Sequence, residues 1–129
     1  MIAGKSAIAL SDNNNALKYL SRLSKNGDND QCAEAAYLVA LIHFNDNNLD
    51  LCEKQIKEIL ASNYTSAYWY ASTFILYGDL YLAKGNAFQA RYTYQSILDN
   101  YEGEDLKKVA EDKIAALDKM EEEEENEEN

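Results

Sequence analysis

The 129-residue chain contains no proline and only five glycines, so it lacks the residues that most tight turns use. A β-rich fold with many hairpins is therefore disfavoured, whereas the abundant alanine, leucine, lysine and glutamate favour helices. No run of eighteen apolar residues occurs, so we expect no membrane insertion. The composition predicts one all-α domain.

Residues that commonly bind metals or act as nucleophiles are scarce. Cys32 and Cys52 are the only cysteines and His43 is the only histidine. They form no CxxC pair and no cluster with metal-ligand spacing, and no HExxH motif or glycine-rich phosphate loop is present. We therefore expect no catalytic residue, no metal and no cofactor. We assign His43 to packing between helices, and we expect the two thiols to lie roughly 11 Å or more apart, beyond disulfide reach.

The negative charge is concentrated at one end. The net charge is −11, and the seven glutamates between Glu121 and Asn129 contribute −7 of it. A terminal run of like charge is typical of a solvated, disordered tail, and we expect residues 121–129 to be one. Docking of this tail on a basic partner is the alternative. Because an acidic chain repels a phosphate backbone, we expect no nucleic-acid partner.

The chain contains an internal repeat. In each of three copies, two small residues stand twelve positions apart, and bulky residues follow the second one after four and seven positions. The pairs are Gly4 and Ala16, Ala40 and Cys52, and Gly78 and Ala90. Two antiparallel helices pack closely only where small side chains face each other, so each copy predicts a helical hairpin. Hairpins of this kind stack into an α-solenoid.

The pattern predicts about seven helices. They cover residues 2–10, 13–24, 31–45, 48–62, 66–84, 87–100 and 104–120. The three hairpins then occupy residues 1–26, 30–63 and 66–101 of a repeat domain over residues 1–120. The last helix, 104–120, suits a capping helix, because one of its faces is polar and the other is a single apolar stripe of Leu106, Val109, Ala110, Ile114 and Leu117.

The third copy resembles the tetratricopeptide repeat (TPR) family. The residues that fit the family pattern are Phe74, Tyr77, Gly78, Tyr81, Gly85, Ala90 and Tyr94. The second copy departs from it, with Ala40 in place of glycine and His43 in place of tyrosine. The closing proline of the family is absent, and the copies are offset by 36 and 38 residues rather than by the usual 34 or so. The resemblance implies an α-solenoid that binds other proteins.

A closer resemblance covers the region from Thr65 to Leu117, carried by the stretch 65–81 and by Phe88-Gln89-Ala90. It is similar to the closing repeats of large TPR proteins of Bacteroidetes-type bacteria, which are exported to the cell envelope. The resemblance therefore implies an envelope or periplasmic location, with the cytoplasm as the alternative. Because the first copy starts abruptly, we expect the chain to be the C-terminal segment of a longer protein, whose upstream repeats could be one of its partners.

The first helix of each TPR hairpin lines the concave face, where partner segments lie. The residues expected on that face are Lys5, Ile8, Tyr37, Leu41, Phe44, Ile75, Asp79 and Leu82. The sequence thus predicts a non-enzymatic scaffold that binds a protein or peptide. A small acidic TPR chaperone for a secreted or assembled substrate is the alternative.

Overall fold

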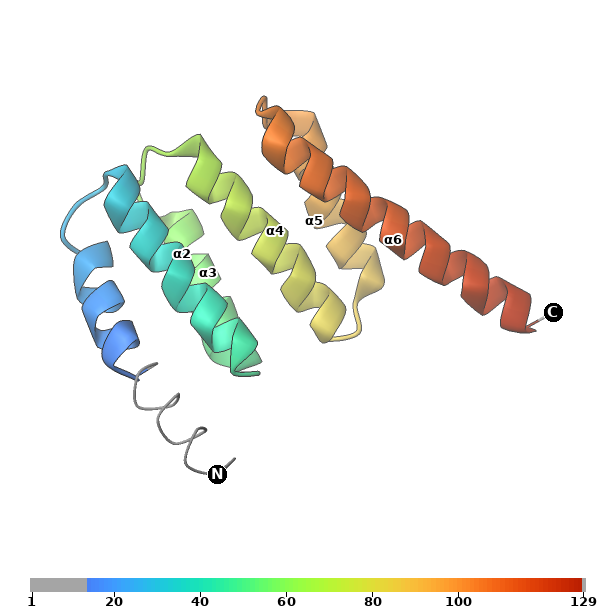
Figure 1. Ribbon diagram of the computed structural model, residues 1–129, viewed down its shortest axis with the longest axis horizontal. Helices are drawn as coiled ribbons and strands as arrows, with labels where there is room; N and C mark the ends of the chain where they lie inside the picture. The colour runs from blue at the N-terminus through green and yellow to red at the C-terminus, as the bar shows by residue number, and fades with distance from the viewer. Residues whose placement is uncertain (1–13, 129) are drawn as a thin grey trace, which may run out of the picture. The chain divides into compact units, whose positions relative to one another are not determined.

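The computed structural model describes residues 14–128 of the chain, and within them the fold consists of six helices without a strand (Figure 1). The first of these helices covers residues 14–24 as far as it is described. The others are α2 (Asp30–Asn45), α3 (Leu49–Ala61), α4 (Ala67–Ala83), α5 (Ala87–Asn100) and α6 (Glu104–Glu128). The predicted all-α class is confirmed. The expected helix over residues 2–10 lies outside the described residues, as do Gly4, Lys5 and Ile8.

The chain divides into two compact units, Met1–Trp69 and Tyr70–Asn129, with the boundary inside α4. In the first unit α2 and α3 pack against each other as an antiparallel hairpin. Asn29 caps α2, since its side chain accepts a hydrogen bond from the backbone N–H of Cys32. Ala40 and Cys52 are both 0% exposed, in agreement with their predicted place at a close helix contact.

The turn after α2 has the same backbone structure as the turn after α4. Asn47 and Gly85, 38 positions apart, both have positive φ, of 62° and 83°. The N–H of Asn48 donates to the carbonyl of His43 at 2.8 Å, and that of Asn86 donates to Tyr81 at 2.8 Å. A left-handed residue with such a bond is a common helix C-terminus. The repeat offset found in the sequence is therefore also present in the backbone of these two turns.

The core of the second unit is formed by α4, α5 and α6. Its buried members are Ala71, Ile75, Ala90, Tyr94, Ile97, Leu106, Ala110 and Leu117. The predicted apolar stripe of α6 supplies the last three, with Ile114 packed beside them, whereas Val109 is 37% exposed. The stripe therefore packs as expected except at Val109.

Gly78 lies directly against the ring of Tyr94. A Cβ atom added at Gly78 would come within 2.7 Å of Cζ and 2.8 Å of Cδ1 of that ring. The sequence pattern paired Gly78 with Ala90, which is completely buried. The nearest side chain is instead that of Tyr94, one turn further along α5. The glycine is required because a large aromatic ring fills the space.

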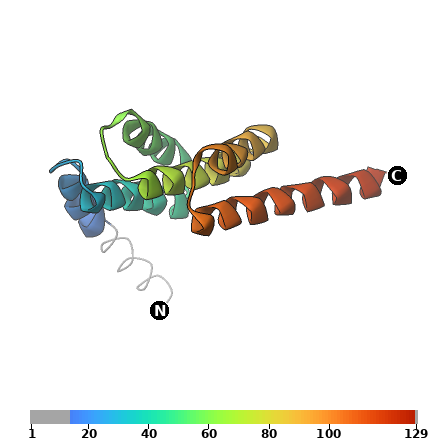
Figure 2. The same cartoon turned by 90° about the horizontal axis from the view of Figure 1, so that it is seen from above.

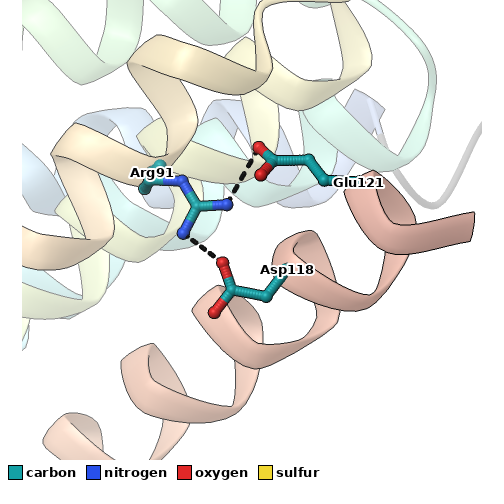
Figure 3. A network of polar contacts seen from close by, with 3 residues as sticks. All are labelled: Arg91, Asp118 and Glu121. Carbon is teal, nitrogen blue, oxygen red and sulfur yellow. Dashed lines mark hydrogen bonds and ion pairs between the residues drawn. The ribbon is translucent and has the colours of Figure 1, made fainter. Parts of the chain in front are cut away.

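The acidic tail differs from the expectation. We expected the last helix to end at residue 120 and residues 121–129 to be disordered, but α6 continues to Glu128. Figure 2 shows this helix running well beyond α5. Arg91 on α5 binds the carboxylates of Asp118 and Glu121, the latter at 2.9 Å (Figure 3). Glutamate is itself a good helix former, so this anchor and the local propensity favour continuation of the helix.

Replacing Gly78 with alanine should lower the free energy of unfolding by about 1–2 kcal/mol, since the clash with Tyr94 outweighs the gain in helix propensity. Urea unfolding followed by circular dichroism measures this change. Gly27→Ala is the matched control, because its Cβ would lie 3.7 Å from Cys32 Sγ, an ordinary contact. An unchanged or raised stability of Gly78→Ala would contradict the close approach.

Replacing Arg91 with glutamine should speed backbone amide exchange in residues 118–128 several-fold, because the end of α6 loses its ionic contacts with α5. Global stability should fall by no more than about 1 kcal/mol, as is usual for exposed ion pairs. Hydrogen–deuterium exchange with mass spectrometry resolves the two effects. Lys108→Gln, which removes a looser pair with Asp112 at 3.9 Å, should leave the exchange of residues 118–128 unchanged.

Candidate functional site

The described residues contain no group of three histidine, cysteine or acidic side chains placed to hold a metal ion. Among the same residues, no helix combines the length and the apolar character that crossing a membrane requires. Both cysteines are buried, and neither forms a disulfide bond.

One candidate surface is the face of α2 that carries Tyr37, Leu41 and Phe44. These three side chains lie at positions i, i+4 and i+7, so they form one stripe along the helix. All three are half-buried. The ring centres of Tyr37 and Trp69 are 5.5 Å apart. The Trp69 ring also packs edge-on against the Tyr68 ring, with 4.8 Å between their centres. We call Tyr37, Leu41 and Phe44 the α2 stripe.

The buried side of α2 has the opposite character, because all its side chains are small. They are Cys32, Ala33, Ala35, Ala36, Val39 and Ala40. The hairpin with α3 therefore uses the small residues of α2 for packing and leaves its large apolar residues partly exposed to solvent. This distribution suits a helix that packs closely on one neighbour and presents apolar area to another ligand.

In the second unit, the side chains predicted for the binding face are occupied by contacts within the unit. Ile75 is part of the buried core, and Leu82 packs against that core. Asp79 accepts hydrogen bonds on the same oxygen, Oδ1, from the Tyr94 hydroxyl and from the Lys113 ammonium at 2.9 Å. Their participation in binding stays a prediction, but each of the three has a structural role in the unit.

The contacts of Asp79 define a polar cluster that joins α4, α5 and α6. Tyr94 is 1% exposed, so its hydroxyl needs a partner inside the protein, and Asp79 provides it. Lys113 neutralises the carboxylate and lies 5.9 Å from the centre of the Tyr94 ring. Burial of the phenol, together with the hydrogen bond to the Asp79 carboxylate, raises the pKa of Tyr94 far above its ordinary value. The cluster holds the three helices in register.

Sequence reasoning did not identify an exposed aromatic pair on α5. Phe88 is 78% exposed and Tyr92 is 69% exposed. The helical period could have predicted this exposure, because positions 88 and 92 lie on the face of the helix opposite the buried Ala90, Tyr94 and Ile97.

A basic groove in the first unit was also missed. An open groove of about 480 Å³ is lined by Leu17, Lys18, Ser21, Arg22, Lys25 and His43. The three cations follow one another at i, i+4 and i+7 on the helix over residues 14–24 and just after it. His43 was expected simply to pack between helices; it is half-buried, and its buried Nδ1 has no hydrogen-bond partner in the described structure. The spacing of the cations was the signal that could have identified this groove.

Comparison with known proteins adds no relative, since no family model, no curated protein and no solved structure matches the chain.

Replacing Tyr94 with phenylalanine should lower the free energy of unfolding by about 1–3 kcal/mol at neutral pH, because the hydrogen bond to a carboxylate is lost. Tyr94 also makes stability depend on pH. Its pKa is raised on folding, so its contribution is complete below the unfolded value of about 10 and is lost as the pH rises above it. Wild-type stability should therefore fall more steeply above pH ~10 than that of Tyr94→Phe, by about 1.4 kcal/mol per pH unit.

Urea unfolding at several pH values between about 8 and 11.5, spanning the ordinary tyrosine pKa, measures both effects. Tyr92→Phe on the same helix is the control, since the exposed Tyr92 side chain should influence neither the neutral stability nor the alkaline slope. Equal slopes for the wild type and Tyr94→Phe would contradict the assignment.

Proposed function

We propose that the chain is a non-enzymatic, TPR-like scaffold that binds an apolar or helical segment of a partner protein on the α2 stripe. The observation that carries this proposal is the arrangement of side chains on α2. Tyr37, Leu41 and Phe44 are large, apolar and half-buried, while the side of α2 that packs in the core contains only small residues. A helical partner with apolar residues at i, i+3 or i+4, and i+7 would complement such a stripe.

The repeated turn supports the repeat class on which this function rests. Two helices are followed by turns with matching left-handed residues, Asn47 and Gly85, at the repeat offset of 38. Helical hairpins related in this way are used widely for protein binding, and the link from fold to function is one of analogy. The resemblance to exported bacterial TPR proteins extends the proposal to a role in the cell envelope.

The chemistry of the stripe favours an apolar ligand. Leu41 and Phe44 carry no charge, and Tyr37 is fixed by its contact with Trp69. Burial of apolar area would supply most of the affinity, at roughly 25 cal/mol per Å², reduced by the cost of association. Because the contact with Trp69 already holds its ring in place, Tyr37 would lose little side-chain entropy on binding.

The proposal is tested with peptides selected from a random display library against the wild-type chain. The enriched peptides should share an apolar pattern with helical period. Leu41→Ala and Phe44→Ala should each weaken their binding about tenfold or more, as loss of a central apolar contact does. Isothermal titration calorimetry measures the affinities, and circular dichroism checks that helicity is retained.

Phe88→Ala is the matched control, because this exposed phenylalanine lies on α5 and outside the α2 stripe. Phe44→Leu should keep most of the affinity, which separates loss of contact from loss of structure. Peptides that bind Leu41→Ala and Phe44→Ala as tightly as the wild type would refute the proposal, as would a selection that yields no binder.

A further inference from the structure

Opposite charges are segregated to two parts of this chain. From Asn13 to Gly27 the sequence contains Lys18, Arg22 and Lys25 and no acidic residue. After Lys119 it contains seven glutamates and no basic residue. The net charge of −11 does not reveal this separation, because the segment from Asn13 to Gly27 contributes only three positive charges.

The structure gathers the three cations in the basic groove. Their side chains are exposed, and they line the groove together with Ser21 and His43. Among the described residues, no carboxylate lines this groove or forms an ion pair with Lys18, Arg22 or Lys25. Lys18 and Lys25 are seven positions apart, which corresponds to about 10 Å along a helix. The groove therefore presents three cations over two helical turns, and Lys25 also lines two adjoining pockets, one with Glu58 and one with Asp28.

The glutamate-rich end of α6 has complementary geometry. It is helical to Glu128, and the side chains of residues 121–127 are exposed. Glu121 is bound by Arg91, whereas Glu122, Glu123, Glu124 and Glu125 continue the same helix beyond this anchor. Four consecutive glutamates place a carboxylate on every side of the helix, so some of them can face a cationic groove in any rotation about its axis.

We propose that the basic groove binds the glutamate-rich end of α6 from a second copy of the chain. Lys18, Arg22 and Lys25 would pair with carboxylates among Glu122–Glu127, and Ser21 would add a hydrogen-bond donor. The contact joins two different surfaces, so it produces head-to-tail assemblies, which are rings or open chains according to the angle between copies. Exposed ion pairs are individually weak and screened by salt, so the association is salt-sensitive. This proposal is independent of the function proposed for the α2 stripe.

The test is the association state of the full chain, measured by sedimentation velocity over a range of concentrations. At low salt the wild type should self-associate as its concentration rises. In about 1 M salt, where the screening length is about 3 Å, it should be monomeric. The triple variant K18E/R22E/K25E should weaken self-association at least tenfold. A wild type that stays monomeric at low salt, or a triple variant that associates like it, overturns the proposal.

A charge exchange identifies the occupant. The tail variant E122K/E123K/E124K/E125K should also fail to self-associate, but mixing it with K18E/R22E/K25E should restore association between the two. The control K54E/K57E/K108E changes the net charge as much as the groove variant does, at exposed lysines elsewhere, and should associate like the wild type. Failure of the mixture to associate overturns the assignment of the tail as occupant. Binding of inorganic phosphate to the groove without self-association also overturns it.

Discussion

Close approach of helices at small side chains is the constraint on which both units depend. In the first unit Ala40 and Cys52 are completely buried where α2 and α3 pack together. In the second unit Gly78 makes room for the ring of Tyr94, and even a methyl group there would overlap with that ring. Helices that approach so closely gain many dispersion contacts, and they tolerate little change in volume at the contact.

The Tyr94 ring also brings a polar group into the second unit. Its hydroxyl is buried with the ring and would be costly without a partner. Asp79 accepts the hydrogen bond, and Lys113 from α6 compensates the charge of Asp79. A single aromatic residue on α5 thus explains a glycine and a carboxylate on α4 and a lysine on α6. The same contacts explain why an acidic residue occurs on the otherwise apolar α4.

The candidate surfaces also depend on how large, small and charged side chains are distributed along the helices. Because small residues make the core contacts of α2, its large apolar residues Tyr37, Leu41 and Phe44 remain half-exposed. Charge is separated in a similar way, with cations along the first described helix and glutamates at the end of α6. The α2 stripe belongs to one helix, whereas the basic groove combines the helix over residues 14–24 with Lys25 and with His43 of α2. The ligands proposed for them differ in chemistry: an apolar segment for the stripe and an acidic segment for the groove.

Apart from the end of α6, the sequence alone determined the described helices and their turns, because these depend on local periodicity and on residues such as Asn47 and Gly85 that accept positive φ. It also indicated the buried small residues Ala40, Cys52, Gly78 and Ala90, because their spacing of twelve recurs, whereas Ala16 of the first copy is half-buried. Only the tertiary structure decided that Gly78 faces Tyr94, that Asp79 binds Lys113 34 positions away, and that His43 lies beside three cations. Such contacts join residues that are distant in sequence, and helical period fixes only the face on which each residue lies. The length of α6 was missed because a run of glutamates suits both a helix and a disordered tail, and Arg91 on another helix favours the first.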